Sequence, residues 1–162
     1  MTILFLDYDG VLHPDDVYLI HEKGVTLSCE NHSLFEHAEL LADVLEPHQN
    51  VRNVLSTSWC HVLSFKEAKE RLPERLRSRV RGSTWHSSRD KYEWNALTRF
   101  QQIIGYVNRH NVQDWIALDN DDYGWPEHKR DYLVHTDDKD GLGGTRGAVD
   151  QLKLKLETAG VW

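Results

Sequence analysis

Four short apolar segments, each ending in polar side chains, are the feature of this sequence that most restricts its fold. They read ILFLD, VLST, WIALD and YLVHTD and end at Asp7, Thr57, Asp119 and Asp137. Apolar runs of this length without strict alternation are typical of strands buried on both faces, and such strands occur in parallel sheets. The sequence therefore predicts a parallel sheet, with a weaker fifth strand at 79–82.

Helical patterns separate these segments, so strands and helices alternate along the chain. Apolar residues recur at helical spacing within 34–45, 97–107 and 149–156. A charged helical stretch at 64–78 must be interrupted or restarted by Pro73. We therefore expect an α/β fold, a three-layer Rossmann-like arrangement around a parallel sheet of strand order 5-4-1-2-3.

Two segments between these elements are expected to lie outside the sheet. Residues 17–28 hold two short β-prone runs around Glu22, Lys23 and Gly24, which predicts a β-hairpin that overhangs the end of the first strand. The Gly-rich stretch at 137–147 predicts a mobile loop before the last helix. A chain of 162 residues without repeats or linkers is expected to form one domain with a self-sufficient core.

Composition restricts the class of protein further. Apolar residues make up 40% and charged residues 28% of the chain, which excludes disordered, collagen-like and coiled-coil proteins. No apolar run is long enough for a membrane helix, and the N-terminus lacks a basic signal region, so no membrane partner is expected. Neither Cys29 nor Cys60 has disulfide or zinc spacing and the histidines are scattered singly, which favours a reducing, cytoplasmic location without a zinc site.

The ends of the strands are where chemistry is expected, because ligands of open parallel sheets lie at the carboxyl ends of the strands. Asp7 and Asp9 follow the first strand and share one side of it, while Asp119 and Asp121 follow another. Carboxylates so close together need a cation, and Mg²⁺ prefers oxygen ligands. A simple polar turn at Asp9-Gly10 is the alternative. However, the hydroxyls at 56–58 follow a third strand, and polar groups at three strand ends favour a magnesium site with these four aspartates as ligands.

The segment ILFLDYDGV resembles the first motif of the haloacid dehalogenase (HAD) superfamily, in which a hydrophobic strand runs into DxDG followed by Thr or Val. Thr57 in VLSTSW resembles the second motif, Arg99 in RFQQI the third and Asp119 in WIALDND the fourth. More narrowly, DYDGVLHP, LSTSW, the RxxxI helix and WIALDxDxxGWP are similar to small HAD domains associated with RNA-repair gene systems. The resemblance implies one HAD-like domain over 1–162, with a β-hairpin flap and a minimal cap.

The resemblance also implies a reaction, that of a Mg²⁺-dependent phosphohydrolase with a phosphoaspartyl intermediate. Asp7 would attack phosphorus, and Asp9 would protonate the leaving oxygen and later deprotonate the attacking water. Thr57 would hold a phosphoryl oxygen, and Arg99 would offset the charge on the phosphoryl group. Asp7 and Asp119, with the main-chain carbonyl of Asp9, would hold Mg²⁺.

One position departs from the family pattern, and for one motif the sequence offers two candidate residues. Asn120 stands where many relatives carry the second of two paired acids, so Asp121 would supply any second carboxylate. Lys91 is an alternative to Arg99 as the base of the third motif. The candidate substrate contacts are Gly10, Ser58, Trp59 and Lys91.

Several other side chains have two interpretations each. Trp59 and Trp125 either line the pocket mouth, where they would stack on a base or sugar, or belong to the core. His13 either begins the hairpin or contacts substrate. The arginine-rich stretch 71–81 is either a solvated helix face or a nucleic-acid contact. Cys60 is expected to be a small core residue rather than a reactive thiol.

A hairpin in place of a larger cap predicts an open pocket, which suits chain-end phosphates better than small metabolites. We therefore expect a phosphorylated substrate such as a nucleotide or the terminal phosphate of a polynucleotide. Because the net charge is −7, local basic groups or a metal must meet such an anion. The alternative is a non-catalytic phosphate- or partner-binding module on the same fold.

Overall fold

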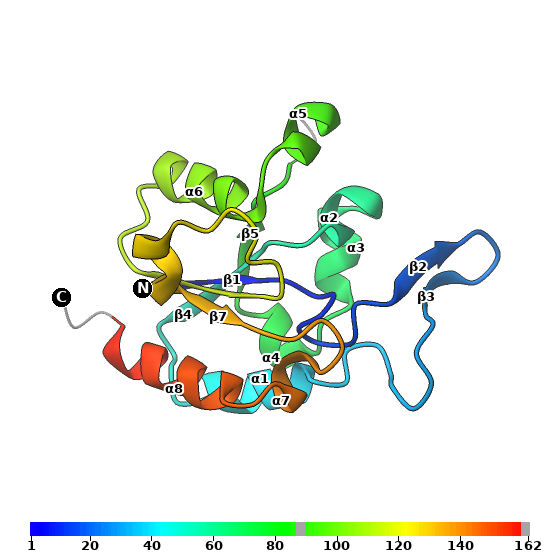
Figure 1. Cartoon of the computed structure of the whole chain (residues 1–162), viewed down its shortest axis with the longest axis horizontal. Helices are drawn as coiled ribbons and strands as arrows, with labels where there is room; N and C mark the ends of the chain where they lie inside the picture. Colours follow the sequence, from blue (N-terminus) through cyan, green and yellow to red (C-terminus); the bar gives the residue numbers. More distant parts are fainter. Residues whose placement is uncertain (87–89, 160–162) are drawn as a thin grey trace.

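The computed structural model describes residues 1–86 and 90–159. Its centre is a five-stranded sheet in which all neighbouring strands are parallel, in the order β5-β4-β1-β6-β7 (Figure 1). The strands are β1 (Thr2–Leu6), β4 (Val51–Leu55), β5 (Val80–Ser83), β6 (Trp115–Asp119) and β7 (Leu133–His135). The parallel sheet expected from the apolar runs is confirmed, including the weaker strand, which is β5.

The strand order differs in its labels from the expected 5-4-1-2-3. Two hairpin strands lie in the chain between β1 and β4, and they take the labels β2 and β3 although they do not join this sheet. Counted along the chain without them, the sheet strands run 3-2-1-4-5 from one edge to the other. Because β1 is the central strand, the residues that follow it lie between the ends of β4 and β6.

Five helices match the stretches of helical periodicity to within a few residues, whereas α2, α5, η1 and α7 were not predicted, and local signals set several of the helix ends. Phe35 has a left-handed φ of 59°, and the first helix begins only after it. Thr98 and Gln101 form a capping box at the start of α6, and Pro73 separates α3 from α4 as expected. The helices are α1 (Ala38–Leu45), α2 (Trp59–Val62), α3 (Phe65–Glu70), α4 (Glu74–Arg77), α5 (Lys91–Ala96), α6 (Arg99–Arg109), the 3₁₀ helix η1 (Glu127–Tyr132), α7 (Gly141–Gly144) and α8 (Ala148–Thr158).

Side chains alternate along β1 and pack on both faces of the sheet. Ile3 and Phe5 belong to one apolar cluster, which residues of α6 cover. Leu4 and Leu6 belong to the other, which α1 and α8 cover. Figure 1 shows α6 on one side of the sheet and α1 with α8 on the other. Burial on both faces explains why the strands read as continuous apolar runs.

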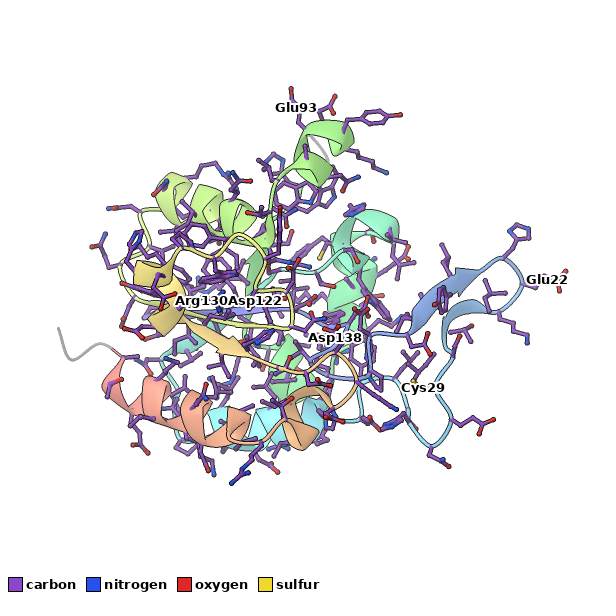
Figure 2. The ribbon with its side chains drawn as sticks, in the orientation of Figure 1. Glu22, Cys29, Glu93, Asp122, Arg130 and Asp138 are labelled. Atoms are coloured by element: carbon purple, nitrogen blue, oxygen red, sulfur yellow. The ribbon has the colours of Figure 1, made fainter. Side chains whose placement is uncertain are left out.

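The segment between β1 and α1 forms the predicted hairpin, in which β2 (Val17–Ile20) pairs with β3 (Gly24–Leu27) in antiparallel fashion. The hairpin is a separate two-stranded sheet, and its tip at Glu22 stands well away from the rest of the molecule (Figure 2). Leu19 is 58% exposed, so the hairpin has apolar side chains on its surface. Residues 7–37 are all described and contain no larger cap.

The Gly-rich stretch before α8 is more regular than the mobile loop that its composition predicts. It contains α7, and the side chain of Asp137 accepts main-chain hydrogen bonds from Lys139 and Asp140. The N–H of Leu142 donates to the carbonyl of Val11 at 2.8 Å, which ties the stretch to the turn after β1. Among the helices of the described residues, none is long and apolar enough to cross a membrane.

Candidate active site

The turn after β1 places Asp7 and Asp9 at the carboxyl edge of the sheet. The N–H of Asp7 donates to the carbonyl of Leu118 in β6 at 3.2 Å, so the chain follows the sheet for one residue more before it turns. Tyr8 points into the core, where its hydroxyl donates to the carbonyl of Ala68 at 2.7 Å. Because side chains alternate here, this anchor directs Asp7 and Asp9 away from that part of the core.

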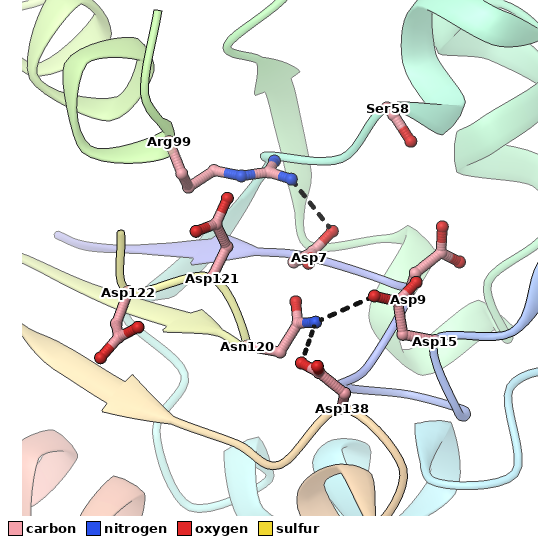
Figure 3. Close-up of a pocket in the computed structure, with 9 residues that line it drawn as sticks. All are labelled: Asp7, Asp9, Asp15, Ser58, Arg99, Asn120, Asp121, Asp122 and Asp138. Atoms are coloured by element: carbon pink, nitrogen blue, oxygen red, sulfur yellow. Dashed lines mark hydrogen bonds and ion pairs between the residues drawn. The ribbon is translucent and has the colours of Figure 1, made fainter. Parts of the chain in front are cut away.

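Asp7 and Asp9 share a cavity of about 360 Å³, which we call the acidic pocket (Figure 3). Segments that follow β1, β4, β6 and β7 contribute to its wall, as expected for a site at the ends of parallel strands. The pocket is lined by Asp7, Asp9, Asp15, Ser58, Arg99, Asn120, Asp121, Asp122 and Asp138. Six of these nine residues are aspartates and Arg99 is the one cation among them, so an anion could enter only with added positive charge.

Arg99 lies at the first turn of α6 and joins the ends of three strands. Its Nη2 is 3.7 Å from Oδ1 of Asp7, and its Nε is 3.3 Å from Oδ2 of Asp119. Its Nη1 donates to the main-chain carbonyl of Ser56 after β4. Burial opposes the charge on the guanidinium, but the carboxylates of Asp119 and Asp7 outweigh it and raise the pKa of Arg99. The arginine therefore stays charged.

Asp7 and Asp119 are buried carboxylates, with 3% and 1% of their surface exposed. Burial, followed by the charge of Asp119, raises the pKa of Asp7 well above its usual range, although Arg99 acts in the opposite direction. Burial also raises the pKa of Asp119, whose Oδ2 faces Arg99 as an ion pair but makes no hydrogen bond within the described residues. The single positive charge of Arg99 cannot neutralise both carboxylates, so negative charge remains at this edge of the sheet.

The donor chemistry of this edge suits a magnesium ion. Buried carboxylate oxygens, one of them without a hydrogen-bond partner, are ligands of the kind that Mg²⁺ prefers. Within the part of the chain that the structure describes, however, no three His, Cys, Asp or Glu side chains come close enough to hold a metal together. The two buried carboxylates of Asp7 and Asp119, which both pair with Arg99, could each offer an oxygen to such an ion. The arrangement does not provide a cage of all four expected ligands, Asp7, Asp9, Asp119 and Asp121.

Two side chains hold Asp9 in place. Nε2 of His13 and Nε1 of Trp59 each lie 2.8 Å from the same oxygen, Oδ1 of Asp9. The N–H of Phe35 donates to Nδ1 of His13 at 3.1 Å, so Nδ1 carries no hydrogen and Nε2 is the donor to Asp9. With Oδ1 fixed in this way, Oδ2 of Asp9 is the oxygen left for a substrate or water.

His13 and Trp59 are therefore the two residues whose role differs most from what the sequence predicts. The sequence offers His13 as a hairpin residue or a substrate contact, but its side chain is fully buried and reaches the pocket only through Asp9. Trp59 is 4% exposed, so it does not stand free at the pocket mouth. The spacing of four residues between Asp9 and His13 is the one local signal, and Asp and His occur at this spacing in many turns where they do not touch.

Asn120 links two of the pocket's acids. Its Nδ2 donates to Oδ1 of Asp138 at 2.8 Å and lies 3.4 Å from Oδ2 of Asp15 (Figure 3). An aspartate here would place a third carboxylate between these two, which explains the departure from paired acids. Gly10 has φ 78°, and a Cβ at this position would lie 2.4 Å from Nδ2 of Asn120. Gly10 thus allows two turns to pack closely and is not among the residues that line the pocket.

Of the residues expected at the second and third motifs, Ser58 and Arg99 line the pocket, whereas Thr57 and Lys91 do not. Ser58 lines the pocket, whereas Thr57 is buried and its Oγ1 accepts the N–H of Trp59 at 3.3 Å. Arg99 lies against the aspartates, whereas Lys91 lines a separate cavity between α2, α3 and β5. Of the two candidates for the third-motif base, Arg99 is the one inside the acidic pocket.

Packing decides between the interpretations of two core candidates. The ring of Trp125 lies 5.0 Å from that of Phe100 and 6.3 Å from that of Trp115, so it is a core residue and not part of the pocket mouth. Cys60 is also buried, and burial raises the pKa of its thiol to about 12. A thiol with so high a pKa is unreactive at neutral pH, as expected for a core cysteine.

The arginine-rich stretch does not form a free basic surface. Arg75 pairs with Glu39 of α1 at 2.6 Å, and Arg77 pairs with Glu74 one turn earlier. Arg79 is buried and donates to three main-chain carbonyls. Arg75, Arg77 and Arg79 are thus engaged within the fold, whereas Arg81 is exposed, so both interpretations of the stretch stay open.

Fold and site together define the class of this protein. A parallel α/β sheet whose central strand ends in Asp-Tyr-Asp-Gly, with hydroxyls, an arginine and a buried aspartate at neighbouring positions, is a HAD-like hydrolase domain. A family model described as the HAD domain in Swiss Army Knife RNA repair proteins matches residues 3–145, and the chain belongs to this family. Comparisons with curated proteins and with solved structures gave no match. The family resemblance carried by the four motifs is thereby confirmed.

Proposed function

We propose that this protein is a Mg²⁺-dependent phosphohydrolase that removes terminal phosphates from nucleotides or polynucleotides. The observation that carries the proposal is the meeting of Asp7, Asp9 and Arg99 in one open pocket at the end of β1. Membership of a family of HAD domains from RNA repair proteins supports it, because the end of an RNA strand can carry a phosphate monoester.

Asp7 and Asp9 divide the reaction between them. In the first step a carboxylate oxygen of Asp7 bonds to phosphorus while the bond from phosphorus to the leaving oxygen breaks, and Asp9 gives that oxygen a proton. In the second step Asp9 takes a proton from water, and the water oxygen bonds to phosphorus as the bond to Asp7 breaks. Inorganic phosphate leaves, and both carboxyl groups return to their first state.

Arg99 and the hydroxyls after β4 would hold the phosphoryl group. Arg99 already lies against Asp7, so it can offset negative charge on the phosphoryl oxygens without moving far. Thr57 is buried beside the pocket and does not line it, but its oxygen accepts the N–H of Trp59 and its hydroxyl hydrogen would donate to a phosphoryl oxygen that reaches the end of β4. Ser58 lines the pocket directly and offers a second hydroxyl.

A magnesium ion would be held by the side chains of Asp7 and Asp119 and the main-chain carbonyl of Asp9. Two carboxylates with several waters are a usual set for Mg²⁺. The ion supplies the positive charge that a phosphate needs in a pocket with six aspartates. Asp121 sits at the rim of the same pocket, where it could bind a metal-bound water.

The first test is phosphate release from phosphorylated oligonucleotides and ribose 5-phosphate, with Mg²⁺ and after chelation. Asp7→Asn keeps the size of the nucleophile and removes its charge, so we expect kcat to fall by about three orders of magnitude or more. Asp122→Asn is the matched control, because Asp122 lies in the same pocket but pairs with Arg130 at its rim (Figure 2). Full activity in Asp7→Asn would contradict the mechanism, and tight binding without turnover would favour a binding module.

Metal binding has a readout that does not depend on activity. A ligand that binds only the folded state stabilises it by mass action, so millimolar Mg²⁺ should raise the Tm of the wild-type protein. Asp119→Asn removes a buried ligand oxygen and should abolish most of that rise. A wild-type Tm that does not respond to Mg²⁺ would count against the magnesium site.

A further inference from the structure

A second cavity, of about 250 Å³, lies beside the acidic pocket between the hairpin and α2. We call it the apolar cavity. It is lined by Asp9, Val17, Tyr18, Leu19, Val25, Ser58, Trp59, Val62 and Leu63. Asp9 and Ser58 line both cavities, so the acidic pocket and the apolar cavity meet at these two residues.

The two cavities differ in the chemistry that they can accept. Six aspartates line the acidic pocket, whereas Asp9 is the single charged residue among those that line the apolar cavity. Leu19 and Val62 are 58% and 49% exposed, so apolar surface on both the hairpin and α2 is open to solvent. Covering such surface with an uncharged ligand is favourable, while a phosphate would lose its hydration without gaining a partner.

Asp9 lies where the two cavities meet, and this position determines the direction in which the leaving group extends from the phosphate. An acid that protonates the leaving oxygen must lie within hydrogen-bond reach of that oxygen. His13 and Trp59 hold the carboxylate of Asp9, so it cannot turn freely to follow a substrate placed elsewhere. The phosphate lies in the acidic pocket on one side of Asp9, so the group bonded to the leaving oxygen must extend to the other side, where the apolar cavity lies.

The other directions out of the acidic pocket are less suitable. Asp15, Asp121, Asp122 and Asp138 form most of the remaining wall, and they would repel any further phosphate of a substrate chain. On the side of the apolar cavity, beyond the shared Asp9 and Ser58, the lining residues are aliphatic or aromatic, and the aromatic ones are Tyr18 and Trp59. Aromatic and aliphatic walls of this kind suit a flat, weakly polar ring.

We infer that the apolar cavity between the hairpin and α2 binds the base of the nucleoside that leaves from the phosphate. The inference rests on the proposed phosphohydrolase function and adds the class of leaving group to it. Trp59 lines this cavity with the 4% of its surface that is exposed, and its Nε1–H holds Asp9. Through this one side chain, a base in the cavity contacts the residue that orients the acid.

The test compares two substrates that differ only in the base. Adenosine 5′-monophosphate and ribose 5-phosphate release the same kind of primary alcohol, so their ratio of kcat/KM reports binding of the base. We expect this ratio to be about tenfold or more in the wild-type protein, a usual gain for stacking and burial of one base. Leu19→Ser and Val62→Ser should bring the ratio towards one while kcat/KM for ribose 5-phosphate stays unchanged.

Ile20 provides the matched control on the same strand. It is 39% exposed and does not line the apolar cavity, so Ile20→Ser should leave the ratio at its wild-type value. A wild-type ratio near one would overturn the inference and leave the phosphohydrolase proposal standing. Failure to hydrolyse either substrate with Mg²⁺ would instead overturn the proposed function, and the inference with it.

Another occupant of the apolar cavity would give a different result. If a second copy of this chain covered the cavity, Leu19→Ser and Val62→Ser would shift the sedimentation coefficient from that of a dimer to that of a monomer. Such a shift with an unchanged substrate ratio would overturn the inference. A reduced ratio with an unchanged sedimentation coefficient would support it.

Discussion

A carboxylate that gives and takes a proton has to keep one oxygen aimed at the reacting atoms. His13 and Trp59 achieve this for Asp9 by donating to its other oxygen, each at 2.8 Å. Because the N–H of Phe35 occupies Nδ1 of His13, the imidazole is held as the neutral tautomer with its hydrogen on Nε2. Both side chains are thus positioning residues that act on substrate through Asp9.

Substitution of His13 separates this positioning from simple packing. His13→Phe keeps a ring but loses the donor, so we expect kcat on ribose 5-phosphate to fall by about tenfold to a hundredfold with little change in KM. His13→Gln places an N–H close to the position of Nε2 and should recover part of the loss. Trp59→Phe, which removes the other donor together with part of a buried ring, should also lower kcat.

Two results would distinguish a structural role. Equal losses of kcat in His13→Phe and His13→Gln, accompanied by equal losses of Tm, would mean that His13 only fills space. Trp85→Phe is the control for tryptophan substitution, because Trp85 is also buried but packs against Trp94 outside the acidic pocket. It should leave kcat unchanged.

At the scale of elements, the ends of helices and strands need partners for their main-chain groups. Arg79, which precedes β5, supplies them for the connection between α1 and β4. Its guanidinium donates to the carbonyls of Leu45, His48 and Val51 at 2.9, 2.8 and 3.1 Å. The planar group with several N–H donors reaches three acceptors in different elements at once, which a single ammonium cannot do.

Arg79→Leu should therefore destabilise the protein strongly. It removes three hydrogen bonds, although each carbonyl keeps one other donor (the N–H of His48, the N–H of Val51 or the side chain of Arg52), and we expect the free energy of unfolding to fall by about 3 kcal/mol. Arg79→Lys should recover less than half of this loss. Arg81→Ala, at an exposed position two residues later in β5, should change the free energy of unfolding by less than about 0.5 kcal/mol. Urea denaturation measures all three, and a small effect of Arg79→Leu would show that water replaces the lost donor.

The elements that the sequence predicts well are those whose signal is local. β1 and β6 are buried along their whole length, so their apolar runs stand out, and Pro73 marks the break between α3 and α4 directly. β5 is an edge strand with a half-exposed pattern, which explains its weak signal. The Gly-rich stretch was the least predictable, because its order depends on a hydrogen bond that the Asp137 side chain accepts from the N–H of Lys139 and on one that the N–H of Leu142 donates to the carbonyl of Val11.

The candidate site divides in the same way. That Asp7 and Asp121 lie in one pocket follows from topology alone, since they follow neighbouring parallel strands whose carboxyl ends lie at the same edge of the sheet. The contact between Asp9 and Trp59 joins residues 50 positions apart and depends on side-chain rotamers, which no sequence pattern encodes. Burial of Trp125 in the core is likewise decided by tertiary packing, because tryptophan suits both a core and a pocket mouth.

At the scale of the whole molecule, the hairpin is the part least integrated into the fold. β2 and β3 pair only with each other, and a two-stranded hairpin has little stability of its own. At its base the N–H of Ser28 donates to the carbonyl of Asp16 at 2.9 Å. These two residues are therefore already placed as the first and fourth residues of a β-turn.

This geometry allows the hairpin to be removed and its role tested. Replacing residues 17–27 by Gly-Gly closes the chain with a two-residue turn, which the hydrogen bond between Asp16 and Ser28 already prepares. Since neither strand pairs with the central sheet, we expect the variant to fold, with a Tm within about 5 °C of the wild-type value for a loss near 1 kcal/mol. It should hydrolyse ribose 5-phosphate at the wild-type rate but lose its preference for adenosine 5′-monophosphate, because one wall of the apolar cavity is gone. Loss of both activities in a folded variant would mean that the hairpin orders the acidic pocket itself, through Asp15, and would assign it to catalysis instead of substrate choice.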